Sequence, residues 1–70
     1  MMPLTLAKRG EINEIKKITG KDEVRRHLAS MGFVVGEKVM VIAELSGNVI
    51  LNVKDSRVAL DRSMAQRILV

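Results

Sequence analysis

Few residues of this chain could take part in catalysis or metal binding. His27 is the only histidine and cysteine is absent, so the nitrogen and thiolate ligands that transition metals prefer are nearly missing. Glu23 lies four residues before His27 and is the only acid on the same side of a predicted helix. A ferrous site needs further ligands converging on this pair. We therefore interpret His27 as a boundary residue and expect neither a metal site nor a cofactor.

Two pairs of carboxylates could in principle perform acid/base chemistry. Glu11 lies three residues before Glu14, and Asp22 is followed directly by Glu23. No nucleophile, cofactor loop or second polar cluster accompanies either pair, although an active site needs such partners. Solvated surface charges are the better interpretation, and we expect the protein not to be an enzyme.

The charge of the chain is moderately basic. Twelve lysines and arginines against eight acids give a net charge of +4, which admits an anionic partner without requiring one. Proteins that bind single-stranded nucleic acid stack bases on aromatic side chains, and Phe33 is the only aromatic residue here. We expect no nucleic acid partner, although duplex binding through phosphates alone depends on where the basic residues lie in space.

One pattern in the sequence favours a protein-binding surface. Met40, Ile42 and Ile50 fall on the nominally outward face of two predicted neighbouring strands and could form one apolar patch. Either this patch binds a partner or a second copy of the chain, or it is covered within the monomer. The covering residues would then be Met64, or Leu4 and Leu6, and the sequence leaves both alternatives open.

One short helix is predicted over residues 22–31, because Val24, Leu28 and Met31 recur with helical spacing. Thr19 or Asp22 would cap its N-terminus. Gly32 follows the last periodic residue, where a left-handed conformation commonly ends a helix. Phe33 would then fold back onto Leu28, so that the helix and the chain leaving it share one apolar cluster.

The remaining segments read as strands. Residues 11–19 fit one strand with a bulge, residues 37–45, 48–54 and 57–61 form a meander, and residues 68–70 form a last strand that could pair with the first. In the meander, Val39, Val41, Ala43 and Leu45 would face inward. The pair Ser46–Gly47 and the pair Asp55–Ser56 would make its turns. Asp61 would cap a short helical turn over residues 62–66.

About five short, curved strands around a small aliphatic interior favour a closed barrel over an open sheet. We expect a mainly β fold, an SH3-like β-barrel with one inserted helix, forming a single domain over residues 1–70. The chain has no apolar run that approaches the length of a membrane helix and no signal peptide, so a cytoplasmic protein is the expectation.

The order of motifs resembles the FeoA family, the small cytoplasmic proteins of bacterial ferrous iron uptake. The segments LTLAKRG and INEIKKITG match its two early glycine-ended pieces. The helix signature is matched by Arg26, Leu28, Met31, Gly32 and Gly36, and the C-terminal signature by Val58, Leu60, Ala65, Ile68 and Val70. The chain departs from the family pattern at His27 and in the turn LSGN, which lacks a proline.

This resemblance implies an SH3-like accessory protein that binds the cytoplasmic side of the membrane Fe²⁺ transporter FeoB. Any association with Fe²⁺ is implied by the family alone. The alternative is a metal-linked regulatory module, as in iron-dependent repressors, or a small β-barrel that binds nucleic acid.

Overall fold

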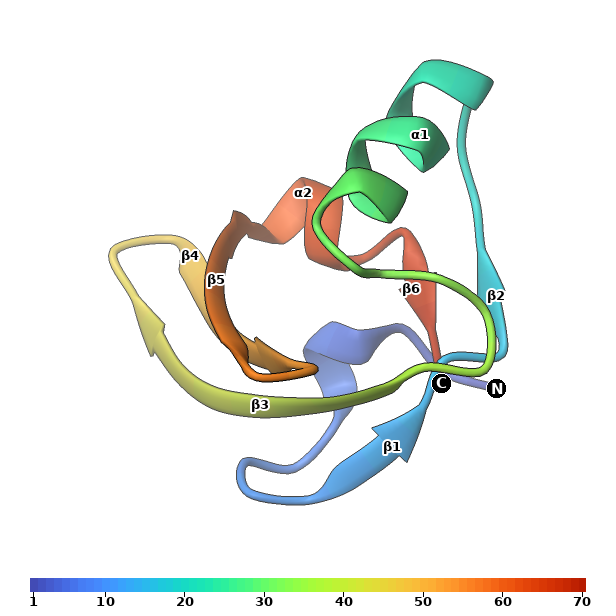
Figure 1. Ribbon diagram of the computed structural model, residues 1–70. Coiled ribbons are helices and arrows are strands. Elements are labelled where there is room, and N and C mark those ends of the chain that lie inside the picture. The colour runs from blue at the N-terminus through green and yellow to red at the C-terminus, as the bar shows by residue number, and fades with distance from the viewer.

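The computed structural model describes residues 1–70, and a three-strand meander forms one side of the molecule (Figure 1). The elements, in chain order, are the 3₁₀ helix η1 (Leu4–Leu6), β1 (Ile12–Glu14), β2 (Lys17–Ile18), α1 (Asp22–Ser30), β3 (Lys38–Leu45), β4 (Asn48–Val53), β5 (Ser56–Asp61), α2 (Arg62–Ala65) and β6 (Ile68–Leu69). The mainly β fold with one inserted helix and a short C-terminal helical turn is confirmed. Neither α1 nor α2 has the length and the apolar composition that crossing a bilayer requires.

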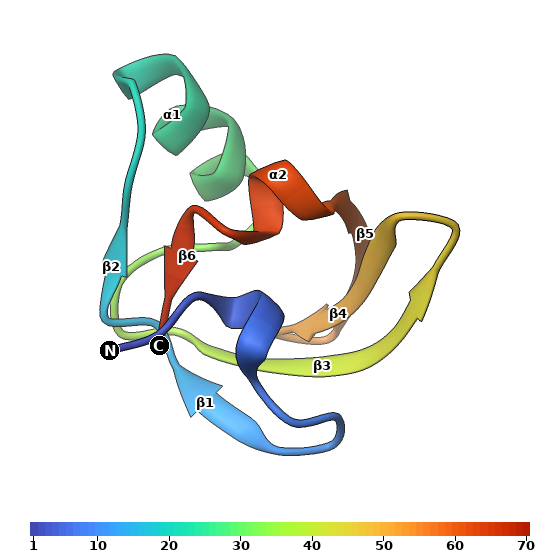
Figure 2. The ribbon, with the colours of Figure 1, turned by 180° about the vertical axis from the view of Figure 1, so that it is seen from behind.

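The strands form two antiparallel sheets. The larger sheet has the order β1-β3-β4-β5, and β2 pairs with β6 in a separate two-stranded sheet. Figure 1 shows β3 curving along the side opposite α1, with β2 and β6 standing beside each other at one end. Seen from behind, η1 lies below α2 and beside β6 (Figure 2). The two sheets therefore enclose the interior together.

The first predicted strand is divided in two, which gives six strands where about five were expected. Ile15 lies between β1 and β2 and is fully buried. Its N–H donates to the carbonyl of Glu37 at 2.9 Å, and its own carbonyl accepts from the N–H of Gly36 at 2.8 Å. These two bonds hold Ile15 against the chain that enters β3, so the segments on either side of it diverge into different sheets.

The end of α1 has the predicted geometry. Gly32 has a φ of +100°, its N–H donates to Ala29 and the N–H of Phe33 donates to Leu28, at 2.9 and 3.0 Å. This pair of bonds is a Schellman motif, and both Leu28 and Phe33 are fully buried. The predicted N-cap is wrong, because Lys21 occupies that position and its side chain makes no capping bond.

A β-bulge interrupts the pairing of β3 with β4. Val41 is opposite Leu51 and Ala43 is opposite Ile50, which leaves Ile42 as the extra residue. A bulge places two residues of one strand against one of its partner, so the alternation of faces shifts after Ile42. Leu45 was predicted to face inward and is instead 63% exposed.

The two hairpin turns have two residues each. In the first, Ser46 and Gly47 have positive φ values of 50° and 81°, as a type I′ turn requires. The second turn is Lys54–Asp55 and not the predicted Asp55–Ser56, because Ser56 already pairs with Val53. Lys54 takes the left-handed conformation in this turn, with a φ of 53°.

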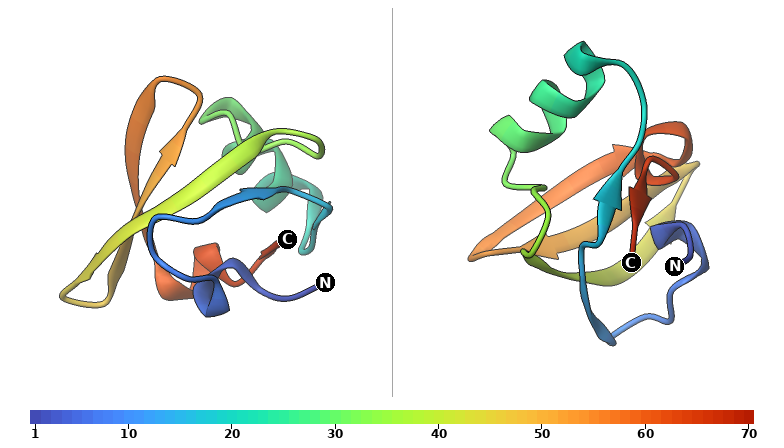
Figure 3. Two further views of the ribbon diagram at one scale, coloured as in Figure 1. Left: turned by 90° about the horizontal axis from the view of Figure 1, so that it is seen from below. Right: turned by 90° about the vertical axis from the view of Figure 1, so that its right-hand side faces the viewer.

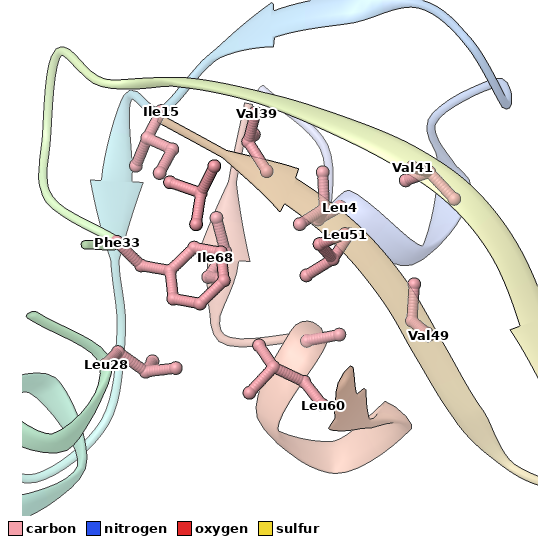
Figure 4. Close-up of a cluster of buried hydrophobic side chains, with 12 residues drawn as sticks. Leu4, Ile15, Leu28, Phe33, Val39, Val41, Val49, Leu51, Leu60 and Ile68 are labelled. Carbon is pink, nitrogen blue, oxygen red and sulfur yellow. The ribbon is translucent and has the colours of Figure 1, made fainter. Parts of the chain in front are cut away.

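The buried interior draws on every part of the chain. Figure 4 shows ten labelled side chains of this core pointing into a common interior. Its twelve members are Leu4, Ile15, Leu28, Phe33, Val39, Val41, Val49, Leu51, Val53, Leu60, Ala65 and Ile68. Leu6, in the same 3₁₀ helix as Leu4, is 67% exposed, because the single turn of η1 directs only Leu4 inward.

The two ends of the described chain lie side by side (Figure 3). The N–H of Met2 donates to Val70 at 2.9 Å and the N–H of Val70 donates to Met2 at 2.8 Å. Pro3 forms an antiparallel bridge with Leu69. Since β6 also pairs with β2, this short strand has a neighbour on each side.

Candidate functional site

The outward face of the larger sheet carries the three residues predicted to bind a partner. Met40 lies opposite Ile12 on β1 and Asn52 on β4, and Ile50 lies opposite Ala43. Residues directly opposite in an antiparallel pair share one face of the sheet. Met40, Ile42 and Ile50 are half-buried, and none of them belongs to the core or to the residues packed against it.

Four further apolar residues extend this surface, which we call the outer apolar patch. Its seven members are Ile12, Met40, Ile42, Ala43, Leu45, Ile50 and Ala59. Ile12 and Leu45 are 62% and 63% exposed. Ile12 was missed because the spacing of the isoleucines in residues 11–19 fits no regular strand, and Leu45 was missed because the bulge at Ile42 reverses its face. The patch spans all four strands of the sheet.

Leu4 and Met64, two of the three residues that were expected to cover this face in the alternative without a partner, lie elsewhere. Leu4 is fully buried in the core, and Met64 packs against the same core. Both side chains therefore lie on the inner side of the sheet. Leu6 is exposed.

A pocket of about 240 Å³ lies at one end of the patch. It is lined by Ile12, Glu37, Lys38, Val39, Met40, Asn52 and Lys54. The ammonium of Lys54 lies 3.7 Å from the carboxylate of Glu37, whereas Lys38 makes no ion pair. The pocket thus combines three apolar residues with one lysine that has no ion-pair partner, which suits an aliphatic side chain next to an acidic one.

His27 and Glu23, the two candidate metal ligands, are both exposed on α1. The carbonyl of His27 accepts a hydrogen bond from the hydroxyl of Ser30 at 2.6 Å. No three His, Cys, Asp or Glu side chains of the chain come together as a group that could hold a metal ion. Asp22, next to Glu23, forms an ion pair with Arg25.

The fold lowers the pKa of Asp61. Its Oδ1 accepts hydrogen bonds from the N–H of Met64 and the hydroxyl of Ser63, both at 2.8 Å. These bonds, that from Met64 first, hold the pKa of Asp61 below its ordinary value because they favour the ionised form. The residue caps α2, as predicted, and its role is structural.

These features define a small SH3-like β domain with a row of apolar side chains on the outward face of its larger sheet. The chain belongs to the FeoA domain family, whose family model matches residues 2–70.

Individual relatives agree with this assignment. The chain is 40% identical over 70 residues to the "Putative Fe(2+) transport protein A" of Methanocaldococcus jannaschii, a match that covers 100% of this chain and 85% of that protein. The crystal structure of an iron uptake regulatory protein, FeoA, superposes with a TM-score of 0.86 at 30% identity, over 96% of this chain and 89% of the other.

A third relative is FeoA of Stenotrophomonas maltophilia, solved in complex with zinc. It superposes with a TM-score of 0.84 at 25% identity and covers 99% of this chain and 88% of its own. It is described as a procaryotic SH3 domain protein and as a candidate ferrous iron transport activating factor. The SH3-like fold expected for this chain is therefore confirmed.

Proposed function

We propose that this chain is a cytoplasmic accessory protein of Fe²⁺ uptake that acts by binding the cytoplasmic part of a FeoB-type membrane transporter. Membership of the FeoA family and the 40% identity to an Fe(2+) transport protein A support the link to iron transport. The outer apolar patch supports action through contact with another protein. In this proposal Fe²⁺ is the cargo of the transporter and is not a cofactor of this chain.

The observation that carries the binding role is the row of aliphatic side chains on the outward face, of which Ile12 and Leu45 are exposed and the three central ones are half-buried. A contiguous exposed apolar patch on a small monomer commonly marks an interaction site. Met40, Ile42 and Ile50 lie at its centre, where contacts that exclude water contribute most to affinity. Lys38 at the edge is placed to pair with an acidic residue of the partner and to favour encounter with it.

The test is capture of the soluble GTPase part of a FeoB-type transporter, with binding measured by calorimetry. We expect Ile42→Lys to weaken binding at least roughly tenfold, because it places a charge in the desolvated centre of the contact. The matched control is Leu6→Lys, which makes the same change at an exposed leucine outside the patch and should bind like the wild type.

Two outcomes would contradict the proposal. One is equal binding by the wild type and by Ile42→Lys while both remain folded by circular dichroism. The other is failure to bind the transporter together with binding to duplex DNA whose affinity falls by several log units per log unit of salt, which indicates phosphate contacts. A large fall in the Tm of Ile42→Lys would instead show that this residue stabilises the fold, and Ile50→Lys would then replace it.

A further inference from the structure

The strand β5 is an open edge of the larger sheet. It pairs with β4 on one side and has no strand on the other. Residues 56–60 take part in none of the backbone hydrogen bonds outside the helices and sheets. An unpaired edge of this kind is a template for pairing with another strand.

The turn that precedes β5 determines which residues face the open edge. In a two-residue hairpin the closing pair exchanges hydrogen bonds, and alternate residues of an antiparallel strand direct their polar groups to opposite sides. The closing pair here is Val53 and Ser56. The N–H and C=O groups of Arg57 and Ala59 therefore point away from β4.

The outward side chains of β5 carry opposite charges on either side of a central alanine, so two antiparallel copies of the strand would match each other in charge. Arg57, Ala59 and Asp61 alternate along the exposed face, since their opposite residues Asn52, Ile50 and Asn48 alternate with the buried residues of β4. Neither Arg57 nor Asp61 has an ion-pair partner in the chain, whose four ion pairs join other residues. Both hydrogen bonds to Asp61 use Oδ1, which leaves Oδ2 available.

We propose that two copies of this chain associate through antiparallel pairing of their β5 edges about a two-fold axis at Ala59. In this register Ala59 lies opposite the Ala59 of the second copy, and the two exchange backbone hydrogen bonds. Arg57 of each copy then lies opposite Asp61 of the other, which gives two cross-strand ion pairs. The small side chain at the axis allows the two outer faces to continue as one eight-stranded sheet.

The charges also reject the neighbouring registers. An axis at Val58 brings Arg57 opposite Ala59 and leaves Asp61 beyond the partner strand, towards the Asp55 of its turn, and an axis at Arg57 brings two arginines face to face. Like charges directly opposite each other destabilise a strand pair. Of the symmetric registers centred on residues 57–59, the one at Ala59 is thus the only one that places each unpaired charge against its opposite.

The proposed contact is small. A stable interface buries roughly 1,200–2,000 Å² in total, and one pair of six-residue strands buries less. We therefore expect a reversible dimer with a dissociation constant between about 0.1 and 1 mM. Sedimentation equilibrium on the whole chain should show a mass that rises from 7.8 kDa towards twice that value over this range. Amide exchange at Ala59 should slow at the same concentrations.

The decisive variant is Arg57→Glu, which turns both ion pairs into like-charge pairs and should raise the dissociation constant about tenfold or more. Asp61→Asn keeps an N-cap for α2 and should also weaken the dimer. The matched control, Lys8→Glu, changes the net charge equally at an exposed residue away from β5 and should associate like the wild type. Ile42→Lys should likewise associate normally, whereas Arg57→Glu should still bind the transporter.

Three results would overturn the proposed dimer. The first is a wild-type protein that stays at 7.8 kDa up to about 1 mM. The second is an Arg57→Glu protein that associates as strongly as the wild type. The third is association that is lost in Ile42→Lys but kept in Arg57→Glu, which would assign the contact to the outer apolar patch.

Discussion

Asp61 serves two purposes at the junction of β5 and α2. Its carboxylate ends the strand on the exposed face and accepts the N–H of Met64 in the first turn of the helix. An ionised N-cap is favoured over a neutral one because it also interacts with the positive end of the helix. The hydrogen bond from the Met64 N–H, and after it that from the Ser63 hydroxyl, lowers the pKa of Asp61, which links the stability of this junction to pH.

The sign of this linkage follows from the direction of the pKa shift. Stabilisation by Asp61 is complete above its ordinary pKa of 3.8, and it is lost as the pH falls through the lower pKa of the folded state. We expect the Tm to fall as the pH is lowered from about 5. Part of that fall should be absent in Asp61→Asn, which keeps an uncharged cap.

Thermal unfolding followed by circular dichroism between pH 7 and pH 2 would measure both profiles. Asp61→Ala is the matched variant, because it removes the cap altogether and should have a lower Tm than Asp61→Asn at neutral pH. Identical pH profiles for the wild type and Asp61→Asn would show that the hydrogen bonds from Met64 and Ser63 do not stabilise the folded state.

At the level of elements, α1 depends on the glycine that ends it. Gly32 has a φ of +100°, and a Cβ built there would meet the nearest Val53 side-chain atom at 3.6 Å, an ordinary contact. A substitution is therefore opposed by the backbone conformation and not by lack of space. Loss of this motif would also separate Phe33 from Leu28 in the core.

Gly32→Ala should lower the free energy of unfolding by about 1–2 kcal/mol, the cost of the left-handed conformation for a residue with a Cβ. Urea denaturation would measure the change. Gly32→Asn is the matched control, because asparagine tolerates this conformation better and should cost less. Equal losses for the two variants would instead indicate that the new side chain disturbs Val53.

The elements that were predicted correctly each have apolar residues that repeat with one clear spacing. In α1 the three apolar residues share one face and Gly32 marks the end, so both the helix and its C-terminal motif could be derived from the sequence. In β3 both faces are apolar around Met40 and Ile42. Strand register is specified only where one face is buried and the other polar, so the bulge and the outward position of Leu45 could not be derived.

Only part of the outer apolar patch could be placed from the sequence. Met40, Ile42 and Ile50 could be placed on the outward face by alternation alone. Ile12 and Ala59 join them only through the pairing of β1 with β3 and of β4 with β5, which depends on the whole sheet. The split at Ile15 has a similar origin, because its two hydrogen bonds reach residues more than twenty positions away.

Considered as a whole, the molecule has a small core and little stability to lose. A single core in a domain of this size supplies roughly 3–5 kcal/mol. Leu28 is fully buried and joins α1 to this core, whereas Leu6 is 67% exposed. The chain thus has one buried and one exposed leucine, and the effect of truncating each on stability can be compared directly.

Leu28→Ala should cost about 2–5 kcal/mol, since it removes buried methyl groups and leaves a cavity, and should leave much of the protein unfolded at 25 °C. Leu6→Ala, the matched control, should change the stability by less than about 0.5 kcal/mol. Urea denaturation of both variants would measure this contrast. A folded Leu28→Ala protein with nearly wild-type stability would show that α1 is not part of the cooperative unit.

The two hydrogen bonds between Met2 and Val70 have a consequence for biosynthesis. Ile68, in the strand beside this contact, is fully buried, so the interior stays incomplete until that residue has left the ribosome. At roughly 5–20 residues per second, the nascent segment that begins with Leu4 waits several seconds for its final neighbour. The packed interior of this domain is therefore complete only after translation of β6, and the aliphatic residues that surround Ile68 lack part of their packing until then.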